Sequence, residues 1–104
     1  MERVEQARVV EREVEAYLTR VVEQAGGKCR KFIPDLARGY PDRIVLLPDG
    51  VLVWVETKRP RGGRLSLAQR VAHAELRSLG QVVEVVWSKK DADRLIEKIK
   101  KGTP

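Results

Sequence analysis

The stretch RIVLLPDGVLVWVETK, residues 43–58, decides the fold of this chain. It contains two apolar runs of strand length, RIVLL and VLVWVET, and between them lies PDG, a tripeptide that favours a tight turn. The stretch therefore predicts an antiparallel β-hairpin. Because neither run alternates with polar residues, we expect helices to cover both faces of the sheet that it forms.

A long amphipathic helix and a short strand are predicted before the hairpin. Apolar residues recur at helical spacing through residues 3–24, and Gly26 and Gly27 then supply a stop. Residues 28–33, KCRKFI, alternate charged and apolar side chains, which is typical of a strand, and the Pro and Gly of residues 34–39 indicate a loop.

The residues after the hairpin predict a helix, a strand and a last helix. Ser66 can cap a helix that ends near Gly80, QVVEVVW has the composition of a strand, and Ser88 can cap the final helix. The predicted order is αβββαβα over residues 1–104, without internal repeats. We therefore expect a single α/β domain with a mixed sheet flanked by helices.

The charge balance favours a polyanionic partner. The 104 residues include 21 Lys and Arg against 15 Asp and Glu, which gives a net charge of +6. In a chain of this size the excess points to nucleic acid, although a basic surface can also serve solubility alone.

The features that bear on the compartment agree with one another. The single cysteine, Cys29, excludes an intramolecular disulfide. The N-terminal segment is charged throughout, unlike a signal peptide, and no apolar run approaches the roughly 18 residues that a membrane span needs. We therefore expect an intracellular, cytoplasmic protein that does not associate with membranes.

Two carboxylates are predicted to meet at one end of the hairpin. Asp42 precedes the first hairpin strand and Glu56 lies near the end of the second, at similar distances from the turn. Adjacent carboxylates repel unless one is protonated or a cation lies between them, and Mg²⁺ favours such oxygen ligands. Lys58, on the same strand face as Glu56, could orient a water or neutralise a phosphate. An ordinary ion pair at a solvated sheet end is the alternative for Glu56 and Lys58.

Four short motifs occur in order along nearly the whole chain. They are Glu11 in EREVEAYL, GYPD at residues 39–42, ETK at residues 56–58 and SLAQ at residues 66–69. Together they resemble the VRR-NUC branch of the PD-(D/E)xK nuclease superfamily. The resemblance implies a restriction-endonuclease-like αβββαβ core and a metal-dependent DNA endonuclease that hydrolyses phosphodiester bonds.

The resemblance also implies roles for residues of the hairpin. Asp42 and Glu56 would bind Mg²⁺ or Mn²⁺, the backbone carbonyl of Thr57 would add a ligand, and Lys58 would act in catalysis. Thr57 is polar where many members of the family have an aliphatic residue, which weakens the expectation that it is buried.

The two flanking helices carry further candidates. The family pattern favours Glu11 as the catalytic acid of the first helix, while Glu15 lies on the same helical face and remains an alternative. Gln69 could contact the substrate or the water shell of the metal, and Ser66 with neighbouring amides could hold a phosphate. Helix capping is the alternative for both residues.

The other basic and aromatic residues have simpler interpretations. His73 is expected to be a surface or packing residue, and Trp54 and Trp87 are expected in the core or at an interface. The candidates for backbone-phosphate contacts are Arg38, Arg59, Arg61 and Arg64.

The resemblance extends to substrate and assembly, because free-standing members of the family look like Holliday-junction resolvases. We therefore expect branched DNA, such as four-way junctions or flaps, as the substrate. We also expect a homodimer, with part of QVVEVVW and Trp87, or of the first helix, at the two-fold interface. A non-catalytic nucleic-acid-binding or interaction module on the same scaffold is the alternative.

Overall fold

The computed structural model describes residues 9–33 and 38–102, and its elements follow the predicted order. They are α2 (Glu11–Gln24), β1 (Lys28–Lys31), β2 (Arg43–Leu47), β3 (Val51–Thr57), α3 (Leu67–Ser78), β4 (Val83–Val86) and α4 (Lys89–Lys100), with a 3-10 turn at Pro48–Gly50. Among the helices described, none is long and apolar enough to cross a membrane.

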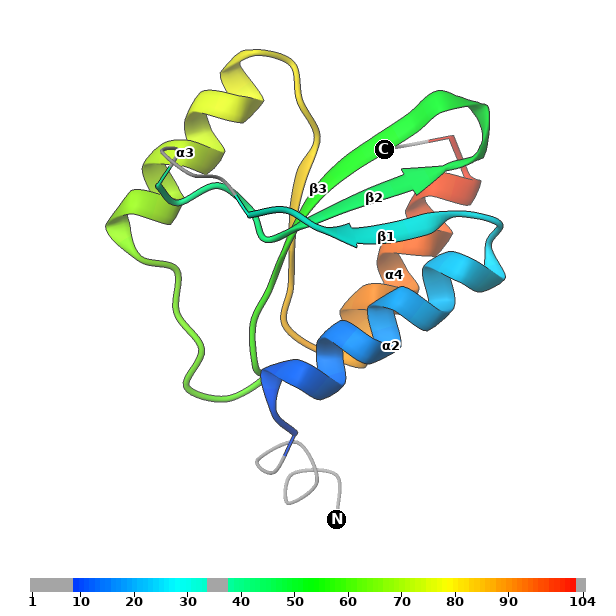
Figure 1. Ribbon diagram of the computed structural model, residues 1–104, viewed down its shortest axis with the longest axis horizontal. Helices are drawn as coiled ribbons and strands as arrows, with labels where there is room; N and C mark the ends of the chain where they lie inside the picture. Colours follow the sequence, from blue (N-terminus) through cyan, green and yellow to red (C-terminus); the bar gives the residue numbers. More distant parts are fainter. Residues whose placement is uncertain (1–8, 34–37, 103–104) are drawn as a thin grey trace.

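The strands form one mixed sheet in the order β1-β2-β3-β4, which confirms the predicted fold class (Figure 1). β1 and β3 are both antiparallel to β2, whereas β4 is parallel to β3. Across the hairpin, Arg43 pairs with Val55. Asp42 and Glu56 are therefore opposite each other at the next register position, at the end of the sheet away from the turn.

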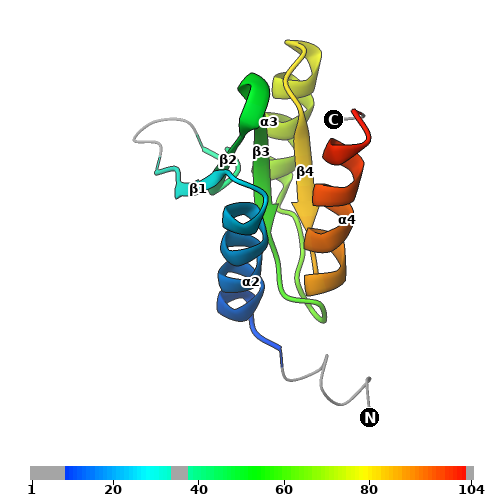
Figure 2. The ribbon, with the colours of Figure 1, turned by 90° about the vertical axis from the view of Figure 1, so that its right-hand side faces the viewer.

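Helices cover the two faces of the sheet unequally. α2 and α4 lie side by side on one face, and α3 lies on the other (Figures 1 and 2). On the α3 face, Leu46 and Leu52 pair across the hairpin but remain 42% and 39% exposed. The expectation that both faces are covered is therefore correct only in part, because α3 packs near β4 and leaves the turn end of the hairpin open.

The hydrophobic core lies between the sheet and the pair α2 and α4. Its side chains come from alternate positions of the strands and from the inner faces of the two helices. Its buried members are Val14, Leu18, Val22, Cys29, Val45, Leu47, Val53, Val55, Val86, Ala92, Leu95 and Ile96. This layer fixes the start of α2 over the end of β3.

In the described residues, the first helix begins at Glu11, which is later than predicted. Val10 precedes it with an extended backbone, φ −97° and ψ 161°, and provides no side-chain cap. The β-branched pair Val9 and Val10 favours extended conformations, so the helical spacing of its side chains does not specify where the helix begins. Residues 3–8 of the predicted helix, and residues 34–37 of the predicted loop, lie outside the described part of the chain.

The predicted helix caps are present. The hydroxyl of Ser66 accepts a hydrogen bond from the amide of Gln69, and that of Ser88 accepts one from the amide of Asp91. Asp91 in turn accepts from the amide of Trp87, one residue before the cap. At the hairpin turn, Asp49 and Gly50 both have a positive φ, which is uncommon for a residue other than glycine such as Asp49.

Candidate active site

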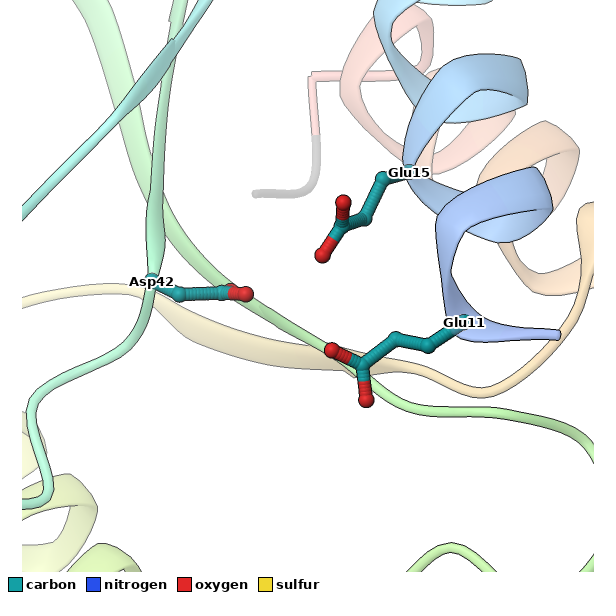
Figure 3. Close-up of side chains that lie close together, drawn as sticks. All are labelled: Glu11, Glu15 and Asp42. Atoms are coloured by element: carbon teal, nitrogen blue, oxygen red, sulfur yellow. The ribbon is translucent and has the colours of Figure 1, made fainter.

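Carboxylates from different elements meet at the end of the sheet away from the hairpin turn. Glu11 and Glu15 lie in the first turns of α2 and point toward Asp42, which immediately precedes β2 (Figure 3). One carboxylate oxygen of each residue lies within 4.8 Å of the others. Hard divalent cations take such oxygen ligands, so these three residues are a candidate metal site.

Glu56 adds a fourth carboxylate from the neighbouring strand. Glu56 is only 4% exposed. Its Oε2 accepts a hydrogen bond from Nε2 of Gln69 at 3.0 Å and lies 3.4 Å from Nζ of Lys58. Its Oε1 is buried and has no hydrogen-bond partner among the described residues. Leaving a buried carboxylate oxygen without a partner is costly, so this atom fits the role of a metal ligand.

The surroundings of Glu56 disfavour its charge. Burial raises the pKa of Glu56 to about 7, with a further contribution from the negative charge of Asp42, and Lys58 only partly offsets this effect. Burial also raises the pKa of Glu11, as do the charges of Glu15 and Asp42. A cation bound among these groups would relieve the repulsion and favour the ionised forms.

Arg43 and Thr57 hold Glu15 and Asp42 in place through contacts that the sequence did not predict. Nη2 of Arg43 lies 2.8 Å from Oε2 of Glu15. The hydroxyl of Thr57 lies 3.2 Å from Oδ2 of Asp42 and 3.3 Å from Oε1 of Glu15. The amide of Thr57 also donates to Oδ1 of Asp42 at 3.3 Å. Thr57 is fully buried, so the expectation that its polar side chain makes burial less certain here is wrong. Its hydroxyl lies within hydrogen-bonding distance of both carboxylates.

The ion pair with Arg43 distinguishes the two acids of α2. Glu15 is engaged by Arg43 and Thr57, whereas the charges that raise the pKa of Glu11 are those of the neighbouring acids. Both acids lie in the cluster, so the choice between Glu11 and Glu15 as the acid of this helix stays open, with Glu15 the more firmly held of the two.

The charged groups of the site carry an excess of negative charge that a divalent cation could neutralise. The carboxylates of Glu11, Glu15, Asp42 and Glu56 are offset only in part by the two cations of Arg43 and Lys58. With every group ionised, a net charge of about −2 remains, which one divalent ion would neutralise. The donor set, the orphaned oxygen and this charge therefore fit Mg²⁺ or Mn²⁺.

Gln69 takes part in the helix cap and also holds Glu56, while its contact with the substrate or the water shell of the metal stays a prediction. Its Oε1 accepts from the amide of Ser66 at 2.8 Å, which completes a capping box, while its Nε2 holds Glu56. The capping alternative for Ser66 is thus present in the structure. Binding of a phosphate by Ser66 and its neighbouring amides stays a prediction.

The basic loop between β3 and α3 lies directly after Lys58 (Figure 1). Nη2 of Arg59 donates to the carbonyl of Gly62 at 3.3 Å, and a Cβ on Gly63 would lie 2.7 Å from the carbonyl of Arg59. The two glycines therefore let the loop fold back on itself. Arg59, Arg61 and Arg64 are exposed, as is Arg38 before β2.

His73 and Trp54 lie near the site. His73 is buried rather than on the surface, and burial lowers its pKa, helped by the charges of Arg77 and Lys58. The indole of Trp54 donates to Oε1 of Gln81 at 3.0 Å and packs edge-on against Phe32. Trp54 thus belongs to an aromatic cluster beside the site. Trp87 is half-buried.

Gly39 sets how closely the GYPD segment approaches α3. Its φ is +81°, and a Cβ at this position would lie 2.2 Å from the backbone carbonyl of Ala68. Only glycine fits this approach, which brings the segment that carries Asp42 against the first turn of α3.

The substitution Gly39→Ala is therefore expected to destabilise the protein by at least about 2 kcal/mol more than Gly80→Ala. Gly80 has the same φ of +81°, but no atom of the residues that the structure describes, other than its chain neighbours, lies within 4 Å of the place that a Cβ would take there, so it isolates the backbone cost. Urea denaturation of both variants measures the difference. Equal stabilities would show that the approach of Gly39 to α3 does not hold the segment in place.

Comparisons with known proteins bear on this site. No family model matches the chain. Over 75 residues, 72% of this chain and 80% of the relative, the sequence is 40% identical to "Putative nuclease p44" of Acyrthosiphon pisum secondary endosymbiont phage 1. A solved structure described as a VRR_NUC domain superposes with a TM-score of 0.79 at 37% identity, covering 84% of this chain and 94% of that one.

Proposed function

Because the chain belongs to the VRR-NUC family, we propose that it is a divalent-metal-dependent endonuclease that hydrolyses phosphodiester bonds in DNA. The observation that carries the proposal is the buried Oε1 of Glu56, which has no partner in the described part of the chain and lies beside a cluster of further carboxylates. An ion pair with only a structural role would not explain why this oxygen is buried without a partner. A pair of acids and a lysine next to an arginine-rich loop suits cleavage of a polyanion.

The ligands would come from three elements. Asp42 and Oε1 of Glu56 would be the principal ligands, Glu11 would join them from α2, and the carbonyl of Thr57 would be a further candidate. When bound, Mg²⁺ or Mn²⁺ polarises the phosphate and lowers the pKa of a water that attacks phosphorus. Gln69 keeps Glu56 in position by holding its second oxygen.

Lys58 would act on the substrate rather than on the metal. Its ammonium is 3.4 Å from Oε2 of Glu56 and its side chain is largely buried, so its direction is fixed. From there it can donate to a phosphate oxygen and stabilise the charge that accumulates during hydrolysis. Glu56 would thus bind the metal, while Lys58 would contact the phosphate that is cleaved.

The arginines of the loop would position DNA without reading its sequence. Arg61→Ala is expected to weaken DNA binding and to reduce the slope of log affinity against log salt by about one, as for one lost phosphate contact. Lys100→Ala is the matched control, because Lys100 is exposed at the far end of α4 and should leave the slope unchanged. Fluorescence anisotropy over a salt series measures both. An unchanged slope in Arg61→Ala would remove this residue from the DNA interface.

We further propose that the substrate is branched DNA and that the working unit is a homodimer. A four-way junction needs paired cuts on two strands, which two sites related by a two-fold axis supply. β4 is the last strand of the described sheet, and Val85 on it and Trp87 directly after it are only half-buried, so this edge suits the contact.

Light scattering at micromolar concentration is expected to give twice the mass of the chain. Trp87→Ser should lower the mass if this edge forms the contact, with Leu79→Ser, on the exposed end of α3, as the control. A monomer that cleaves four-way junctions fully at the same concentration would contradict the dimer.

Incubation with a panel of DNA substrates tests the proposed activity. Single-stranded, duplex, flapped and four-way-junction DNA are compared with Mg²⁺, with Mn²⁺ and with EDTA. We expect cleavage of the branched substrates only when a divalent metal is present. Cleavage in EDTA, or none of any substrate with metal, would overturn the proposal.

A further inference from the structure

A groove lies between the segment before β2 and the outer surface of α3. Its volume is about 550 Å³, and the residues that matter among those lining it are Arg38, Tyr40, Leu67, Ala68, Val71 and Glu75. The segment that carries Arg38 and Tyr40 crosses α3 in Figure 1. The close approach of Gly39 to the backbone of Ala68 fixes the two walls relative to each other.

The helical wall of the groove presents apolar side chains to solvent. Leu67 is 77% exposed and Val71 is 58% exposed, although both lie on a helix that buries other residues. The opposite wall is an aromatic ring that is held in place, since Tyr40 packs edge-on against Trp54 and beside Phe32, with centroids 5.8 Å and 6.0 Å away. A flat apolar group would remove this surface from water.

The groove adjoins the candidate active site. Gln69, which hydrogen-bonds to Glu56, lies on α3 between Ala68 and Val71. On the other wall, Tyr40 is two residues before Asp42. A DNA strand whose phosphate reaches the carboxylates would therefore place a neighbouring nucleotide at the groove.

The carboxylate at the groove disfavours a phosphate or a second copy of the chain as its occupant. The carboxylate of Glu75 would repel a phosphate but can accept from a base amino group, and the guanidinium of Arg38 can stack on a base. The row Leu67, Val71, Glu75 and Leu79 at four-residue spacing is interrupted by this charge, which is unfavourable at the centre of a protein interface.

We propose that this groove binds one unpaired nucleobase of the substrate strand, beside the phosphate that is cleaved. The inference rests on the proposed nuclease function and deepens it, since it makes a disrupted base pair part of what the site recognises. Branch points and flaps provide such a base without the cost of opening a duplex.

A scan with abasic nucleotides tests the proposal. Flapped DNA carries a single abasic site at each position around the cut, and kcat/KM is measured for the native protein, for the Leu67→Asn/Val71→Asn double variant and for Leu79→Asn. The two groove residues and the control are all strongly exposed, and asparagine changes no charge. Affinity without metal, measured by anisotropy on the same substrates, tests the groove independently of cleavage.

In the native protein one abasic position should lower kcat/KM and affinity by about tenfold, the loss of one stacked base. The double variant should lose about tenfold on intact DNA, with little further loss from the abasic site, while Leu79→Asn behaves as the native protein. Loss of less than twofold at every position, or an unchanged abasic effect in the double variant, would overturn the proposal. So would a native dimer that the double variant converts to monomers. Abasic-sensitive binding without cleavage would instead contradict only the nuclease function.

Discussion

Glu56→Gln and Asp42→Asn are each expected to reduce DNA cleavage to below about one thousandth of the native rate. Each change removes a negative charge from the proposed metal site while keeping the size of the side chain. The amide oxygen that replaces the carboxylate of Glu56 could still accept from Gln69, and the one that replaces the carboxylate of Asp42 could still accept from the amide of Thr57. The loss would therefore come from the chemistry and not from unfolding.

Binding of DNA separates this effect from a loss of substrate affinity. Without metal, both variants should bind DNA as tightly as the native protein or slightly more tightly, because each removes a carboxylate that faces phosphate. Glu13→Gln is the matched control, an exposed acid of α2 that the site does not include, and it should cleave normally. Full activity in Glu56→Gln would rule out the proposed mechanism.

In the absence of metal, Glu56→Gln is also expected to stabilise the protein at pH 8. The pKa of Glu56 is raised from 4.5 to about 7 in the folded protein, so the folded state binds this proton more tightly than the unfolded state. Its favourable contribution is present below about pH 4.5 and is lost as the pH rises through about 7. At pH 8 the buried charge therefore costs on the order of 3 kcal/mol, which the neutral amide avoids.

Chemical denaturation in EDTA between pH 5 and pH 8 measures this effect. The native protein should lose stability over this range, and Glu56→Gln should lose distinctly less. Addition of Mn²⁺ at pH 8 should restore stability to the native protein and not to the variant. Identical pH dependence in the two proteins would show that Glu56 does not carry a buried charge in the folded state.

The fold could be predicted where the determining signals were local. The hairpin needed only two apolar runs and PDG, and the caps needed only Ser66 and Ser88 with the polar residues that follow them. The start of α2 could not be predicted this way, because Val9 and Val10 continue the apolar pattern without adopting the helix.

The strand residues of the candidate site were predictable because the geometry of a hairpin fixes how they lie relative to one another. Antiparallel register places Asp42 opposite Glu56, and strand alternation places Lys58 on the same side as Glu56. The roles of Arg43 and Glu15 were not predictable, since their ion pair depends on where α2 docks over the end of the sheet. An arginine at the start of an apolar strand, immediately after Asp42, was the available signal.

The burial of Thr57 and His73 likewise could not be predicted from the local sequence. Thr57 gave no sign in sequence that its hydroxyl would lie between two carboxylates, because that contact joins β3 to α2. His73 was expected to be a surface or packing residue, and only the docking of α3 shows that it is buried. Local pattern thus predicted the elements and the strand acids, while tertiary packing decided their partners.

Calorimetric titration with Mn²⁺ tests most directly the claim that these carboxylates form a metal site for cleavage. The native protein and Lys58→Ala should both bind Mn²⁺, although Lys58→Ala should not cleave DNA, since Lys58 is proposed to act on phosphate. Glu56→Gln should bind at least about tenfold more weakly, because it removes the charged ligand. Equal binding of Mn²⁺ by Glu56→Gln and the native protein would contradict the account.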